Sequence, residues 1–122
     1  MYQANEPISL TAGATVSRGR YVKLSSGKVI HATASSDNVI GVSASDGTAD
    51  SAILVNLYGG LLEVEASAAI AVDALITATT AGKAVSTTSA AARILGTALT
   101  ACSADGEFIT VLHQPTPSHK DA

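Results

Sequence analysis

This 122-residue chain has few of the residues that stack, cross-link or carry charge. It has no tryptophan, one phenylalanine and three tyrosines, so an aromatic platform for nucleic-acid bases is not expected. Its single cysteine, Cys102, has no partner for an internal disulfide. The net charge of −3, without any run of lysine or arginine, argues against sequence-independent binding to nucleic acid. We therefore expect neither a disulfide framework nor a nucleic-acid partner.

Long apolar runs are missing as well. No stretch reaches the roughly 18 consecutive apolar residues that a membrane-spanning helix needs. The first seven residues have neither a basic nor an apolar stretch, so no signal peptide is predicted. These two features predict a protein without a membrane partner.

Small side chains are abundant instead. The chain has 23 alanines, 14 serines and 13 threonines, whereas leucine, isoleucine, valine and phenylalanine together number 29. Much of the 47% hydrophobic content is therefore alanine, which buries far less apolar surface than leucine or phenylalanine. We expect a thin core that gains part of its stability from contacts with other subunits.

The dominant pattern is the alternation of apolar and polar residues that is typical of β-strands. Two glycine-containing turns, at residues 25–27 and 81–82, separate alternating segments as in β-hairpins. The alanine-rich segment 66–74 has helical propensity, but its neighbours favour extended or loop structure. Strands are predicted at residues 8–10, 21–24, 28–30, 39–42, 52–57, 62–65, 75–77, 83–85, 94–99 and 107–112. The sequence therefore predicts an all-β fold.

The two halves of the chain resemble each other. A shift of 55 positions places Gly27-Lys28 on Gly82-Lys83 and Ile53-Leu54 on Phe108-Ile109. Further upstream the shift is 54, so a one-residue length difference is expected near Gly19 and Asp73. A β-motif this short cannot bury its apolar face alone, so we expect the two copies to pack on each other.

The predicted architecture is a compact β-barrel or sandwich built from two tandem copies of this motif. The copies span about residues 8–60 and 61–113 and form a single domain. Residues 1–7 are predicted to be an extended N-terminal arm. Residues 114–122, with two prolines and little to bury, are predicted to be a flexible C-terminal tail.

No group of residues has the spacing of a catalytic or metal site. Nucleophilic catalysis needs a base beside a serine or cysteine, but the histidines lie at a strand end or near the tail. These are His31, His113 and His119. Glu63 and Glu65 alternate along one strand, which marks a solvent face. We predict no catalytic residue, no cofactor and no bound metal.

The densest positive site is Arg18-Gly19-Arg20. Two interpretations are open. The arginines meet an acidic surface of a partner, or they form a charged turn that keeps a strand edge soluble.

A recurring framework carries a family resemblance. The first copy has a hairpin turn at residues 25–28, Val39-Ile40-Gly41-Val42 and then Asp46-Gly47. The second copy repeats it with residues 81–83, 94–98 and 105–106. Over about residues 6–113 this pattern resembles the capsid decoration, or cement, proteins of tailed bacteriophages. One departure is Asp73, which stands where the first copy has Gly19.

The resemblance implies a structural virion protein without enzymatic activity or cofactor. Such proteins are made in the bacterial host cytoplasm and sit on the outer capsid surface, commonly as homotrimers. There they bridge subunits of the major capsid protein and help the shell resist internal pressure. The alternative is a carbohydrate- or cell-binding β-module of a phage tail or fibre.

The contact residues are predicted mainly in the N-terminal arm, with the C-terminal tail as the second choice. The arm combines an aromatic residue, of a type enriched at interfaces, with an extended proline-containing segment. The arginine pair completes the predicted capsid or subunit interface. Its members are Tyr2, Gln3, Asn5, Pro7, Arg18 and Arg20.

Overall fold

The computed structural model describes residues 8–57, 61–88 and 92–113, and within these ranges it consists of strands and turns. The first half contains β1 (Ile8–Thr11), β2 (Tyr21–Ser25), β3 (Lys28–His31), β4 (Val39–Ser43) and β5 (Ala52–Leu57). The second half contains β6 (Leu61–Glu65), β7 (Leu75–Ala78), β8 (Ala84–Ser86), β9 (Gly96–Ala98) and β10 (Phe108–His113). The all-β prediction is confirmed. The described part has no helix long and apolar enough to cross a membrane.

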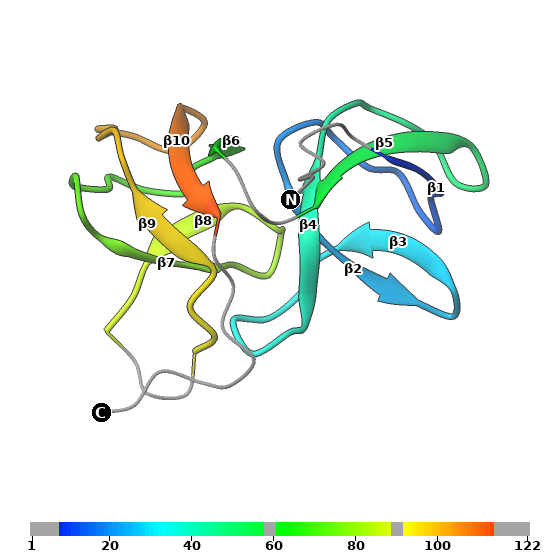
Figure 1. Ribbon diagram of the computed structural model, residues 1–122, viewed down its shortest axis with the longest axis horizontal. Coiled ribbons are helices and arrows are strands. Elements are labelled where there is room, and N and C mark those ends of the chain that lie inside the picture. Colours follow the sequence, from blue (N-terminus) through cyan, green and yellow to red (C-terminus); the bar gives the residue numbers. More distant parts are fainter. Residues whose placement is uncertain (1–7, 58–60, 89–91, 114–122) are drawn as a thin grey trace, which may run out of the picture.

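The two halves have the same strand order. The first sheet runs β1-β5-β4-β2-β3 and the second runs β6-β10-β9-β7-β8, so each strand has its counterpart five strands later. In each sheet the first and last strands in this order approach at a parallel bridge, Ala12–Val29 in one and Ala66–Ala84 in the other. Each sheet thereby curls into a small barrel, which leaves few open strand edges. Figure 1 shows the two barrels side by side.

The strand registers show where the two copies first differ in length by one residue. In the first hairpin Ser25 pairs with Lys28, which leaves a two-residue turn. In the second hairpin the amide of Thr79 bonds the carbonyl of Lys83, which leaves three residues between them. The extra residue therefore lies in the second hairpin, and the prediction of a difference near Gly19 was wrong.

A second length difference lies before the last strand of each copy. Ile53 pairs with Leu10, and its structural counterpart Ile109 pairs with Val64. Ile53 therefore corresponds to Ile109. The shift of 55 positions paired Ile53 with Phe108, and that prediction was wrong. Burial explains the difference, because both isoleucines point into a barrel core whereas Phe108 lies at the surface.

The same turns in both copies have left-handed backbone. Gly27 and Gly82 have φ angles of 79° and 77°, and Gly19 and Asp73 have φ angles of 81° and 73°. Aspartate tolerates this conformation better than most non-glycine residues. The replacement of glycine by Asp73 in the second copy therefore preserves the turn.

The hydrophobic core has two parts of unequal size. The first barrel contains a small cluster of its own, made of Ala12, Val16, Val22, Val29, Ile53 and Val55. The larger cluster fills the second barrel but also includes residues of the first half, namely Tyr21, Ala32, Val39 and Val42. The alanine-rich segment 66–74 lines this cluster in extended and turn conformations, tied by a bridge between Ile70 and Cys102. The packing of the two halves thus depends on a core that crosses between them.

Backbone contact closes this junction at the second hairpin. The amide of Tyr21 donates a hydrogen bond of 2.7 Å to the carbonyl of Gly82. A Cβ atom at Gly82 would lie 2.8 Å from the carbonyl oxygen of Tyr21. A Cβ atom at the equivalent Gly27 would meet nothing within 4 Å. Glycine is therefore needed at position 82 for close approach as well as for its φ angle.

We predict that Gly82→Ala destabilises the protein more than Gly27→Ala, although both residues have nearly the same φ. Gly27→Ala should lower the free energy of unfolding by about 1–2 kcal/mol, the usual cost of a left-handed alanine. Gly82→Ala should add the cost of separating the two halves. Urea unfolding of both variants measures the difference, and equal losses would contradict the close-approach argument.

Candidate functional site

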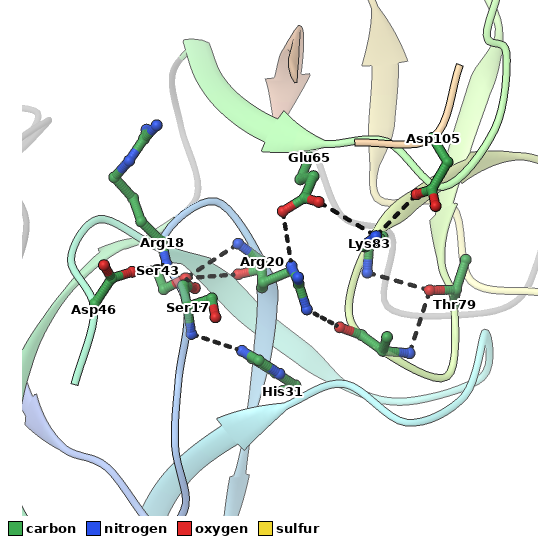
Figure 2. A network of polar contacts seen from close by, with 11 residues as sticks. Ser17, Arg18, Arg20, His31, Ser43, Asp46, Glu65, Thr79, Lys83 and Asp105 are labelled. Atoms are coloured by element: carbon green, nitrogen blue, oxygen red, sulfur yellow. Dashed lines mark hydrogen bonds and ion pairs between the residues drawn. The ribbon is translucent and has the colours of Figure 1, made fainter. Parts of the chain in front are cut away.

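The predicted contact residues fall into two groups. Tyr2, Gln3, Asn5 and Pro7 lie outside the described residues. Arg18 and Arg20 lie in the turn before β2, where the first half meets the second, and Figure 2 shows them within a network of polar contacts.

Arg20 is directed into the junction between the halves. Its Nε lies 3.2 Å from Oε1 of Glu65, and its Nη1 donates a hydrogen bond of 3.0 Å to the carbonyl of Ala81. Both partners belong to the second half. Arg20 therefore ties the two halves of one chain together.

Glu65 is the centre of the network (Figure 2). Besides Arg20 it contacts Lys83, whose Nζ lies 3.2 Å from Oε2 of Glu65 and 2.8 Å from Oδ1 of Asp105. The side chain of Glu65 is 17% exposed, against 68% for Glu63. The prediction that both glutamates mark a solvent face therefore holds for Glu63 and was wrong for Glu65.

The surroundings of Glu65 favour its charged form. Burial alone would raise the pKa of this carboxyl, but hydrogen bonds and positive charge from Lys83 and Arg20 outweigh burial and lower it. The same contacts raise the pKa of Lys83, with the hydrogen bond to Asp105 as the largest cause. The network is therefore fully charged at neutral pH.

The first copy retains one part of this network. Lys28, the counterpart of Lys83, lies 2.6 Å from Asp50. A hairpin lysine paired with an acidic loop residue thus recurs in both copies. The counterpart of Glu65 in the first copy is Thr11, so the junction network is a feature of the second copy alone.

Arg18 points away from the junction core and has different partners. Its guanidinium lies over the Phe108 ring, 4.7 Å from the centroid, in a cation–π contact. Its Nη1 is 3.9 Å from Glu63, and its side chain is 51% exposed. Its backbone amide is fixed by Asp46 at 2.6 Å. Arg18, Glu63 and Phe108 thus form an exposed cluster that a partner can reach.

His31 has a structural contact in this turn. Its Nε2 accepts a hydrogen bond of 3.0 Å from the amide of Ser17. Burial and then the charge of Arg20 lower the pKa of His31, which keeps the imidazole neutral as an acceptor needs. His31 therefore helps to hold the turn that carries both arginines. No group of three or more metal-ligating side chains occurs among the described residues.

Tyr21 and His113 form a second, buried contact between the halves. Their ring centroids are 6.0 Å apart with an interplanar angle of 30°. The Tyr21 hydroxyl and both ring nitrogens of His113 are buried and have no hydrogen-bond partner among the described residues. Burial raises the pKa of Tyr21 and lowers that of His113 to about 4.

His113 lies beside the tail, as predicted, but the structure adds it to the last strand, which was predicted to end at residue 112, and buries it. It is the last residue of β10 and is fully buried. The sequence carried a signal for this burial, because His113 continues the alternation of the inward-facing Ile109 and Val111. Because histidine is polar, the apolar pattern of the strand ended before residue 113.

The Glu65 network predicts a specific loss of stability. Glu65→Gln keeps the shape but removes the charge, and should lower the free energy of unfolding at pH 7 by about 2 kcal/mol. Because the folded pKa is lowered, the stabilisation is present above the unfolded value of 4.5 and is lost as pH falls through the folded value. Urea unfolding from pH 7 to pH 3 measures both effects. Glu63→Gln, on the same strand, is the control and should change stability by less than about 0.5 kcal/mol.

His113 predicts a pH dependence in a higher range. The histidine of the unfolded chain is protonated near pH 6.5, whereas His113 in the folded protein is protonated only near pH 4. The free energy of unfolding should therefore decrease by about 3 kcal/mol as the pH is lowered from 6.5 to 4. His113→Leu should remove most of this slope, with the remainder due to His31. His119→Gln is the control and should keep it. Identical slopes for His113→Leu and the wild type would refute the assignment.

Comparisons with known proteins show which proteins have a similar architecture. The chain is similar in structure to the head fiber gp8.5 N base of bacteriophage phi29, with a TM-score of 0.75. The similarity covers 95% of this chain and 98% of that chain at 22% sequence identity, which shows a common fold. A comparison with curated proteins gives no match. The family model described as phage cement protein matches residues 2–113. The chain therefore belongs to the phage cement protein family and is a structural phage protein associated with the capsid.

Proposed function

We propose that this protein decorates the outside of the phage head and bridges neighbouring subunits of the major capsid protein. The family match over residues 2–113 is the observation that carries the proposal. The internal use of Arg20 and Glu65 supports a structural role, because this ion pair joins the two barrels, and Lys83 holds Glu65 from within the second barrel. Bridging requires a protein whose parts do not separate when its partners move.

The proposed contact surface combines the N-terminal arm with the Arg18 cluster. Arg18 is half exposed and is held by Phe108 and Asp46, so it can meet an acidic or polar capsid surface at low entropic cost. Arg20 contributes indirectly, since its contact with Glu65 fixes the same turn. The arm, residues 1–7, supplies an aromatic side chain and a proline.

We further propose that residues 8–113 act as one domain and that the protein binds as a homotrimer. The core cluster shared by both barrels supports the single domain. A trimer would present three copies of a weak contact, which sum through avidity. The proposed oligomer forms in the bacterial host cytoplasm before it binds the head.

A second candidate is a module of a phage fibre that binds carbohydrate or cells. The similarity to a head fiber base favours a fibre role. Glycan sites usually stack sugars on exposed aromatic rings. Of the aromatic side chains in the described part, Tyr21 is buried and Phe108 is covered on one face by Arg18. The capsid role is therefore preferred.

Removal of residues 1–7 should weaken binding to expanded heads by tenfold or more, about 1.4 kcal/mol per binding event, while the fold is retained. Arg18→Gln should weaken it to a smaller extent. Lys28→Gln is the matched control, because it also removes one half-exposed, ion-paired positive charge but lies in the β2–β3 hairpin and not in the turn before β2. Co-sedimentation with heads that lack the protein measures occupancy, and circular dichroism checks the fold.

Unchanged occupancy after removal of the arm would refute the arm as a contact. Binding to immobilised glycans without binding to heads would favour the fibre module. Labelling of intact, DNA-filled heads with an antibody against this protein tests the outer location, and absence of label would refute it.

A further inference from the structure

Four leucines form a continuous patch on the outer face of the second barrel. Leu61 pairs with Leu112, Leu112 pairs with Thr97, and Thr97 pairs with Leu75. Residues opposite each other in antiparallel strands point to the same face, and so does a residue two positions along the chain. Leu99 lies just beyond β9 and joins them, because its amide donates a hydrogen bond to the carbonyl of Thr110, two residues before Leu112. We call Leu61, Leu75, Leu99 and Leu112 the leucine patch.

The leucine patch faces solvent. Leu61, Leu99 and Leu75 are 64%, 42% and 37% exposed, and Leu112 is half-buried. Their chain neighbours Leu62, Ile76 and Ala98 point inward and are buried. The barrel core is thus complete without the patch, which makes no contribution to it.

The first barrel shows what covers this face of the motif. There Tyr21 pairs with Val42, and Val42 pairs with Asn56, in the positions that Leu75, Thr97 and Leu112 have in the second barrel. Tyr21 and Val42 are 0% and 1% exposed, because they enter the core cluster of the second barrel. In the first copy this face is therefore buried against another copy of the same motif.

We infer that the leucine patch binds a second copy of this chain. The patch is the free equivalent of a face that the motif already buries against itself. The row of Leu61, Leu112, Thr97 and Leu75 contains no charged side chain, as is usual for permanent contacts between identical subunits. Glu63 borders this row, in the next row with Thr110 and Leu99. Leu61 also lines a groove with residues of both barrels, among them Arg18, Asn56 and Glu63, so the patch reaches the place where the barrels meet. The inference names the contact face of the proposed homo-oligomer and does not depend on capsid binding.

Light scattering after size exclusion, without heads present, tests the inference. The wild type should show a multiple of the 12.1 kDa of one chain, and Leu61→Lys with Leu99→Lys should reduce the mass to one chain. The control is Leu24→Lys with Leu54→Lys, which alters two exposed leucines of the first sheet and should keep the wild-type mass. Circular dichroism and urea unfolding report whether each variant is folded.

A second measurement covers the case in which the lysine variant does not fold. The photo-crosslinker p-benzoylphenylalanine in place of Leu99 should give a band at twice the chain mass, and in place of Leu24 it should not. A monomeric wild type at all concentrations, or an unchanged mass of the folded patch variant, would overturn the inference. The inference would also be overturned if the wild type is a monomer and the patch variant no longer binds heads, because the patch would then contact the capsid. Failure of an oligomeric wild type to bind heads would refute the capsid role alone.

Discussion

Tyr21 completes a core that does not belong to its own barrel. It is the largest fully buried side chain among the described residues, and it packs in the cluster of the second barrel against His113. Four of the eleven residues that the second half contributes to this cluster are alanines, which bury little apolar area, so a ring from the neighbouring copy adds a large share. The close approach at Gly82 and the charges around Glu65 are arranged about this insertion.

The two copies have the same framework and opposite roles at the face that carries Tyr21. The strand order, the hairpin glycines and a hairpin lysine paired with an aspartate recur in both. The first copy uses this face to join the second, whereas the second copy places leucines there and leaves them exposed. The same face thus forms an internal interface in the first copy and an exposed apolar surface in the second, where we infer contact with another subunit.

Polar groups at the junction give the contact its geometry at some cost in stability. Three buried polar atoms of Tyr21 and His113 have no hydrogen-bond partner within the described ranges, and a buried polar atom without a partner destabilises a fold. The partly buried Glu65 is compensated by two cations. The aromatic contact therefore supplies burial, while the ion pairs fix how the barrels are oriented. Both respond to acid, through His113 first and Glu65 at lower pH.

The sequence by itself determined the strands, the hairpin turns and the duplication, because alternation and glycine placement are local properties of the chain. It also indicated the family through that rhythm. The tertiary structure alone decided that Glu65 is an internal ion-pair partner, that His113 is buried and that Arg20, unlike Arg18, faces inward. It also decided where the copies differ in length, since one inserted residue changes which strand positions face the core. These properties depend on which copy covers which face, and that choice is made by contacts between residues about 45 to 90 positions apart.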